Sequence, residues 1–152
     1  MEIKNGNDYL PQVKALIIEY TNKLNRDLSF QNLSAELDDI AKKYTSPNGE
    51  SLVAVENNRA LGMVAYHKLN NKRCEMKRLY VRPEARGKHL GELLVKRIIE
   101  RAVLAGFEEM VLDTINPLQT AIYLYQKMGF KKCEPYYNNP MTDVIYMSKK
   151  LK

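Results

Sequence analysis

The sequence has few of the features that membrane-spanning, metal-binding and disulfide-stabilised proteins depend on. No apolar run approaches the roughly 20 residues of a membrane span. The chain has two histidines, His67 and His89, and its two cysteines, Cys74 and Cys133, follow no metal-ligand spacing, so we expect no metal site. The N-terminus carries no apolar signal region, so we expect free thiols and a cytoplasmic protein. Without repeats or long linkers, the length suits a single domain over 1–152.

The sequence also lacks two common phosphate-binding loops, G-x-x-x-x-G-K-S/T and G-x-G-x-x-G. Instead, residues 79–91 (LYVRPEARGKHLG) predict a strand end, a basic turn and the start of a long helix. Backbone N–H groups at a helix N-terminus lack partners inside the helix, and the helix dipole adds about half a positive charge there. Gly87 and Gly91 allow a ligand to approach the backbone, and Arg86 and Lys88 add full charges. The turn therefore predicts a diphosphate site.

The charge of the chain is unevenly distributed. Residues 57–101 carry twelve basic and four acidic side chains, whereas residues 1–56 carry six basic and nine acidic ones. A basic block can indicate nucleic-acid binding. Because this one is centred on the predicted phosphate turn, an anionic cofactor explains it with fewer assumptions, and we expect no nucleic-acid partner. The acidic first third would suit a cationic amine, although ordinary solvated helix faces are the favoured explanation.

The turn resembles motif A of the GNAT superfamily of N-acetyltransferases, written R/Q-x-x-G-x-G/A. Arg86 matches its first position and Gly91 its last, whereas His89 stands at the middle glycine. The resemblance implies that the turn binds the diphosphate of acetyl-CoA as co-substrate. The cofactor-binding residues expected in this turn are Arg86, Gly87, Lys88, His89, Leu90 and Gly91.

A second block, residues 121–130 (AIYLYQKMGF), resembles GNAT motif B, A-x-x-L-Y-x-x-x-G-F. The resemblance implies that Tyr125 is the catalytic acid, which protonates or hydrogen-bonds the departing thiol of coenzyme A; a phenol is a neutral donor at pH 7. Tyr123 lies on another helix face and is assigned no role. Leu118 occupies the position of the family's asparagine. Asn116 is the candidate replacement in cofactor binding, although helix capping also explains it.

The strand predicted over 74–81 resembles the fourth strand of the family. The resemblance implies that the backbone of Leu79, Tyr80 and Val81 holds the acetyl carbonyl and the pantetheine amides of acetyl-CoA. These three residues complete the expected cofactor-binding set, and their side chains carry no signal of their own.

Glu75 is the candidate catalytic base. Strand alternation predicts that Glu75, Lys77, Leu79 and Val81 share one face. A carboxylate on a buried strand is costly unless it is used or paired. The resemblance implies a base that acts through water. The alternative is a structural ion pair with Lys77 or Arg73.

Two further segments are candidates for acceptor binding. Arg78 is predicted to point to the face opposite Glu75, where it would bind either a substrate carboxylate or a structural acid, the second being slightly favoured. The resemblance places the loop 135–140 beside the acceptor pocket. Tyr136 and Asn139 in this loop would line a wall for a small polar amine, or belong to an ordinary loop.

Periodicity and turn signals predict an α/β (α+β) chain with element order β-α-α-β-β-β-α-β-α-β-β. Expected strands cover 1–5, 51–56, 59–68, 74–81, 110–114, 130–134 and 144–151. Expected helices cover 8–23 (capped by Asp8), 30–44, 88–105 and 117–128. This is the GNAT order, and it implies a mixed, mostly antiparallel sheet of about seven strands with helices on both faces.

The sequence thus predicts an acetyl-CoA-dependent N-acetyltransferase. The resemblance implies direct transfer in a ternary complex without an acyl-enzyme, and no cysteine here is paired with an obvious base. The leading acceptor is a small-molecule or amino-acid-like amine. A peptide or protein amine and a non-catalytic acyl-CoA-binding sensor are the alternatives. We expect no membrane partner, and the sequence leaves open whether the chain forms a homodimer.

Overall fold

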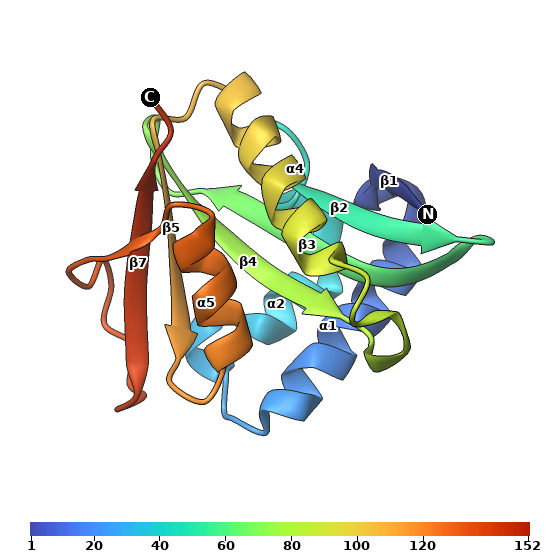
Figure 1. Ribbon diagram of the computed structural model, residues 1–152, viewed down its shortest axis with the longest axis horizontal. Coiled ribbons are helices and arrows are strands. Elements are labelled where there is room, and N and C mark those ends of the chain that lie inside the picture. The colour runs from blue at the N-terminus through green and yellow to red at the C-terminus, as the bar shows by residue number, and fades with distance from the viewer.

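One seven-stranded mixed sheet organises the computed structural model, which describes residues 1–152 (Figure 1). The strands lie in the order β1-β2-β3-β4-β5-β7-β6. All neighbours are antiparallel except β4 and β5, which are parallel. The strands are β1 (Glu2–Asn5), β2 (Gly49–Glu56), β3 (Arg59–Lys68), β4 (Arg73–Val81), β5 (Glu109–Ile115), β6 (Lys131–Lys132) and β7 (Val144–Lys150). The predicted sheet is confirmed.

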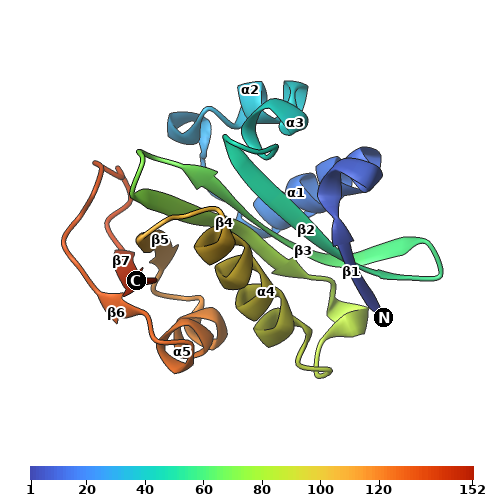
Figure 2. The same cartoon turned by 90° about the horizontal axis from the view of Figure 1, so that it is seen from above.

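Helices cover both faces of the sheet (Figure 2). They are α1 (Leu10–Leu24), α2 (Leu33–Asp38), α3 (Ile40–Lys43), α4 (Leu90–Leu104) and α5 (Gln119–Lys127). Leu94 and Ile98 of α4 are buried in the core on one face, together with Tyr125 of α5. Leu16 of α1 and Ile40 of α3 are buried in a second core on the other face. None of these helices has both the length and the apolarity needed to cross a membrane.

The parallel strands β4 and β5 separate towards their carboxyl ends (Figure 1). Their pairing covers three positions, the last of which joins Glu75 to Val111. Beyond that point β4 continues to Val81 and β5 to Ile115 without pairing with each other. The sheet is therefore open between these two strands at its centre. A ligand can reach backbone N–H and C=O groups there that continuous strand pairing would use for hydrogen bonds.

A β-bulge in β4 overturns the predicted face of its side chains. Between the pairs Met63–Tyr80 and Ala65–Lys77, β4 has two residues where β3 has one. Arg78, the first of the two, has φ +62°. Because an extra residue resets the alternation, Glu75 and Lys77 lie on the α1 side, whereas Leu79 and Val81 pack against the core on the α4 side. The prediction of one shared face is wrong.

Two N-terminal helices differ from their predicted bounds. Residues Gly6–Tyr9 form a 3-10 turn, and the side chain of Asn5, not Asp8, caps it by accepting from the Asn7 N–H at 2.8 Å. The helix predicted over 30–44 is divided into α2 and α3 at Asp39. This residue has non-helical φ and ψ of −149° and 76°, and its carboxylate caps α3.

The C-terminal half departs at three further boundaries. The helix predicted from residue 88 begins at Leu90. His89 has φ +55°, which lies outside the right-handed helical region, so it is not part of the helix. The helix α5 begins at Gln119, two residues after Pro117, so this proline is not its first residue. The strand predicted over 130–134 is reduced to β6 (Lys131–Lys132), at the edge of the sheet.

Candidate active site

The turn before α4 presents an unpaired run of backbone donors. Gly87 and His89 have φ values of +84° and +55°, both in the left-handed region. The backbone N–H groups from Gly87 to Glu92 donate no hydrogen bond, and the first N–H to do so belongs to Leu93, which bonds the His89 carbonyl at 3.1 Å. Donors of this kind at a helix N-terminus bind phosphate. The geometry of the turn fits the diphosphate of acetyl-CoA.

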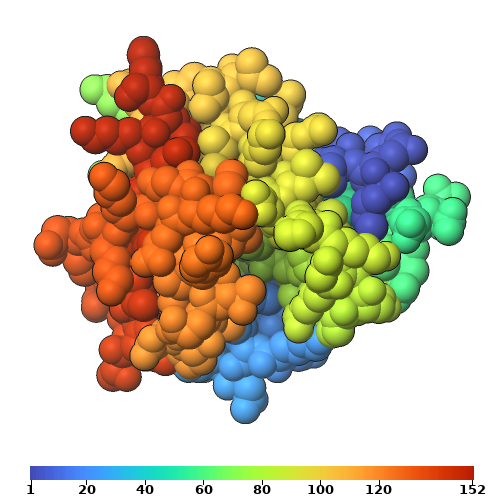
Figure 3. All heavy atoms as spheres, viewed as in Figure 1, coloured from blue at the N-terminus to red at the C-terminus, as the bar shows by residue number.

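The side chains of this turn are exposed, and the turn lies at the surface beside α5 (Figure 3). Arg86 donates from Nε to the Val81 carbonyl at 3.2 Å. A Cβ added at Gly91 would lie 3.6 Å from Leu124 of α5, so the two helices are close at this point. His89 Nδ1 lies 4.0 Å from Glu92 Oε2, and its side chain is 88% exposed. Leu90 is the exception, because its side chain is buried in the core.

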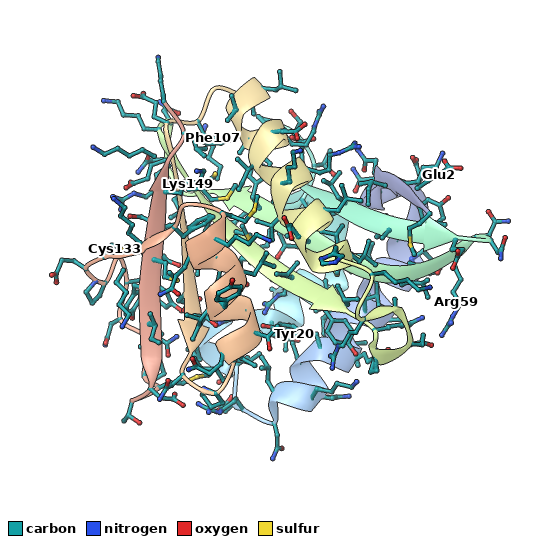
Figure 4. The ribbon with its side chains drawn as sticks, in the orientation of Figure 1. Glu2, Tyr20, Arg59, Phe107, Cys133 and Lys149 are labelled. Carbon is teal, nitrogen blue, oxygen red and sulfur yellow. The ribbon has the colours of Figure 1, made fainter.

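A cavity of about 70 Å³ occupies the opening between β4 and β5. Met76 to Leu79 line it from β4, and Leu112 to Ile115 line it from β5. Tyr125 of α5 and Tyr20 of α1 also line it (Tyr20 is labelled in Figure 4). Since α1 and α5 lie on opposite faces of the sheet, the cavity crosses the sheet.

Tyr125 reaches this cavity from the α5 side. Its ring packs edge-to-face against Phe130, with centroids 6.0 Å apart, and its side chain is 8% exposed. Its hydroxyl makes no hydrogen bond within the protein. Burial, followed by the nearby hydroxyl of Tyr20 and carboxylate of Asp113, raises the pKa of Tyr125 well above its usual value. The phenol is therefore protonated at neutral pH and able to donate its proton.

Glu75 is buried on the opposite side of the sheet from Tyr125. Its Oε1 lies 2.6 Å from His67 Nε2 and its Oε2 accepts from the Tyr136 hydroxyl, while Lys77 Nζ lies 3.9 Å from Oε1. Burial favours a higher pKa for this carboxyl. The hydrogen bond from His67 and the charge of Lys77, with the bond from Tyr136, outweigh it and lower the Glu75 pKa to about 2. Glu75 is therefore ionised.

Arg78 forms a buried ion pair with Glu36 of α2. Its Nε lies 2.9 Å from Glu36 Oε2, and its Nη2 lies 3.1 Å from Oε1, which also accepts from Lys43 at 2.8 Å. Burial opposes ionisation of Glu36, but the two cations lower its pKa to about 2. The Arg78 side chain thus lies on the same side of the sheet as Glu75, not opposite it, and a structural acid neutralises it.

The loop 135–140 closes one wall of this side. The Tyr136 hydroxyl donates to Glu75, and the Tyr137 hydroxyl donates to Asp113 of β5. Asn139 is buried and donates from Nδ2 to Asp113 Oδ2 at 2.9 Å. The loop is therefore tied to both β4 and β5. Asp113 was not identified as a site residue from the sequence. The sign that could have identified it is a carboxylate within the otherwise largely apolar segment 110–114.

The remaining predicted residues lie apart from these groups. The Tyr80 side chain extends to the α1 side, where its hydroxyl donates to Glu19 at 2.6 Å. Asn116 is exposed, and its Oδ1 accepts from Gln119 Nε2 at 2.9 Å, whereas Leu118 lines the cavity. Cys74 is buried in the core, where burial raises its pKa to about 12. Both cysteines are free thiols. Cys133 lies away from the cavity: in the view of Figure 4, β7 and α5 lie between it and Tyr20, which lines the cavity.

Comparisons with known proteins agree with this geometry. The family model described as "Acetyltransferase (GNAT) family" matches residues 17–130. An uncharacterized N-acetyltransferase of Schizosaccharomyces pombe is 49% identical over 140 residues, which cover 91% of this chain and 86% of that protein. A GNAT-family acetyltransferase of Staphylococcus aureus Mu50 has a TM-score of 0.82 at 21% identity, over 99% of both chains. A GNAT-family acetyltransferase of Elizabethkingia anophelis with acetyl-CoA bound has a TM-score of 0.60 at 25% identity, over 74% of this chain and 82% of that chain.

Proposed function

This chain belongs to the GNAT family of acetyltransferases, and we propose that it transfers the acetyl group of acetyl-CoA directly to the amine of a small, amino-acid-like acceptor. Because the matching family model and the similar proteins are acetyltransferases, the chain is an acyltransferase. One observation carries the finer proposal. The unpaired N–H groups before α4 lie close to α5, and Tyr125 of α5 lines the opening between β4 and β5.

The donor would be held by backbone groups and by the charges of the turn. The N–H groups from Gly87 to Glu92 would bind its diphosphate, with Arg86 and Lys88 adding positive charge. The bulge at Arg78 and Leu79 leaves these two residues without a register partner in β3 or β5, so their peptide groups can orient the thioester. Asn116 remains a candidate contact at the start of α5. The thioester supplies the electrophilic carbonyl carbon.

Tyr125 is proposed as the acid. When the amine nitrogen bonds to the carbonyl carbon and the carbon–sulfur bond breaks, the sulfur leaves as a thiolate that needs a proton. The Tyr125 hydroxyl lines the cavity, is protonated and has no competing hydrogen bond. Direct transfer is also supported by Cys74, because this thiol is buried with a raised pKa and is a poor nucleophile.

Glu75 is proposed as the group that binds the acceptor amine and receives its proton through water. It is an ionised carboxylate on the side of the sheet opposite the phosphate turn, so donor and acceptor would enter from opposite faces. A pKa of about 2 makes it a weak base, because a base works best with a pKa near the operating pH. Attraction of an ammonium is the part of this role that the geometry supports most strongly.

An amine panel tests the proposal. The protein is mixed with acetyl-CoA and one amine at a time, free thiol is measured, and the acetylated product is identified by its mass. Thiol release that depends on a small amine, with one acetylated amine for each thiol, is the expected result. Release with peptides alone would move the acceptor to another class. Binding of acetyl-CoA without transfer to any amine or peptide would contradict the proposal.

A further inference from the structure

Two hollows meet at the acceptor side of the proposed site. One is the cavity between β4 and β5. The other is a groove of about 400 Å³ between the segment just before α2, Lys43 of α3, the end of β3, the start of β4 and the loop 135–140. The two hollows share two lining residues, Gln31 and Lys77. Gln31 and Lys77 therefore mark the place where the groove and the cavity adjoin.

Lys77 is the cation of these hollows that lacks a hydrogen-bonded partner. Its side chain is 11% exposed, and Nζ lies 3.9 Å from Glu75 Oε1 without making a hydrogen bond. Both oxygens of Glu75 already accept from other groups, His67 and Tyr136. Burial lowers the pKa of Lys77 to about 8, although Glu75 opposes the shift. An ammonium that makes no hydrogen bond within the protein has donors free for an anionic group on a ligand.

The other cations around the two hollows are already engaged. Arg78 and Lys43 share Glu36. Arg73 bonds Glu109 at 2.7 Å, and Arg26 bonds Asp143 at 2.9 Å. The phosphate turn lies on the opposite face of the sheet, so a diphosphate there does not need Lys77. The Lys77 ammonium, which lies near Glu75 without making a hydrogen bond to it, is therefore available to the acceptor.

Gln31 supplies the complementary group. Its Oε1 is buried and has no hydrogen-bond partner. An amide oxygen accepts hydrogen bonds and so matches an amine or ammonium. The junction of the two hollows thus contains one cation with free hydrogen-bond donors and one buried amide oxygen without a partner. A carboxylate and an amine on the same small molecule would satisfy both.

We propose that Lys77 and Gln31 are specificity-determining residues that select an acceptor with a carboxylate close to its amine, as in a free α-amino acid. This inference rests on the proposed amine acetylation. Lys77 would bind the carboxylate, and Gln31 with Glu75 would bind the amine. Neither Lys77 nor Gln31 takes part in bond making; both position the nitrogen towards the opening between β4 and β5.

Matched acceptors test the selection. For a set of amino acids, kcat and KM are compared with those of the corresponding carboxamides, which keep the amine but lose the charge. The wild-type protein is expected to favour the amino acids by roughly ten- to a hundred-fold in kcat/KM, in line with one charge-assisted hydrogen bond. Equal use of both sets, with transfer proceeding normally, would overturn the inference and leave the proposed function intact.

Substitutions then assign the preference to residues. Lys77→Met is expected to raise KM for amino acids by about ten-fold or more, with carboxamides little affected, and Lys77→Arg to restore part of the preference. Gln31→Leu should raise KM for both sets, because both carry the amine. Lys96→Met, at an exposed position of α4, is the matched control.

Two further readings keep the test interpretable. The rise in melting temperature with acetyl-CoA shows whether each variant is folded and able to bind the donor. A folded Lys77→Met protein whose kcat falls equally for both acceptor sets, with a changed pH profile, would overturn the inference and make Lys77 a participant in proton transfer. Absence of thiol release with every amine in the wild-type protein would instead contradict the proposed function.

Discussion

Oε1 of Glu75 lies 2.6 Å from Nε2 of His67, across the antiparallel pair that joins β4 to β3. The same carboxylate accepts from Tyr136 in the loop 135–140, so one buried residue connects two strands and a loop. This arrangement keeps Glu75 ionised and fixes its position on the side of the sheet where we propose that the acceptor amine binds. It also gives Glu75 a structural role, which must be separated experimentally from a role in catalysis.

The pH dependence of Glu75→Gln separates the two roles. If Glu75 receives the proton of the amine, the variant should lose the most activity near neutral pH, by roughly ten- to a thousand-fold, and partly recover at high pH. The reason is that a base becomes dispensable once the acceptor has already lost its proton. The measurement is a pH–rate profile with one identified acceptor. A defect of equal size at every pH would indicate positioning or structure instead.

Acid should destabilise the protein through Glu75 and Glu36. Both pKa values are about 2 in the folded protein, below the ordinary value of 4.5. A lowered pKa stabilises the folded state above about pH 4.5, and this stabilisation is lost as the pH falls towards 2. Each group should contribute on the order of 3 kcal/mol to the loss.

Denaturant unfolding at pH 7, 4 and 2.5 measures the loss of stability in acid. Glu75→Gln should flatten the pH dependence, whereas Glu56→Gln, at an exposed position, should leave it unchanged. An unfolding free energy that stays constant from pH 5 to pH 2.5 would show that these carboxyls are not held ionised.

The sheet, the turn before α4 and the position of Tyr125 could be predicted from the sequence because they depend on local signals. Apolar periodicity, Gly87 and the motif around Tyr125 act within one element or one turn. The partners of Glu75 could not be predicted, since His67 and Tyr136 come from another strand and a loop. The bulge at Arg78 was missed for a similar reason. An arginine at φ +62° carries no local signal, and its ion pair with Glu36 of α2 forms only in the folded chain.

His89→Gly tests the backbone of the phosphate turn. His89 has φ +55°, a conformation that glycine adopts without strain, so relief of strain should offset the added entropy of the unfolded chain. Stability should remain within about 1 kcal/mol of the wild type, and affinity for coenzyme A should be unchanged or tighter. Titration calorimetry with coenzyme A measures the affinity.

His89→Ala is the matched control, because it removes the imidazole but keeps the Cβ and the strained backbone. If both variants lose affinity by a similar large factor, the imidazole itself binds phosphate. If the glycine variant alone binds more tightly than the wild type, the freedom and access of the backbone decide the affinity.

Tyr125→Phe tests the acid. The substitution keeps the ring and its packing against Phe130 and removes only the hydroxyl. Turnover should fall by roughly ten- to a thousand-fold, the usual range for a lost acid, while binding of acetyl-CoA changes little. Tyr123→Phe serves as the control, because that side chain lies on the same helix and is 69% exposed. Wild-type turnover in Tyr125→Phe would remove the acid from the mechanism.

Binding of acetyl-CoA at the α4 turn is the central claim, and the melting temperature of the protein with and without acetyl-CoA tests it most directly. A ligand that binds only the folded state at a hundred times its Kd should raise the melting temperature by roughly 5 to 10 °C. Arg86→Glu should reduce this rise markedly, whereas Arg97→Glu, at an exposed position further along α4, should preserve it. A melting temperature that does not move in millimolar acetyl-CoA would contradict the account.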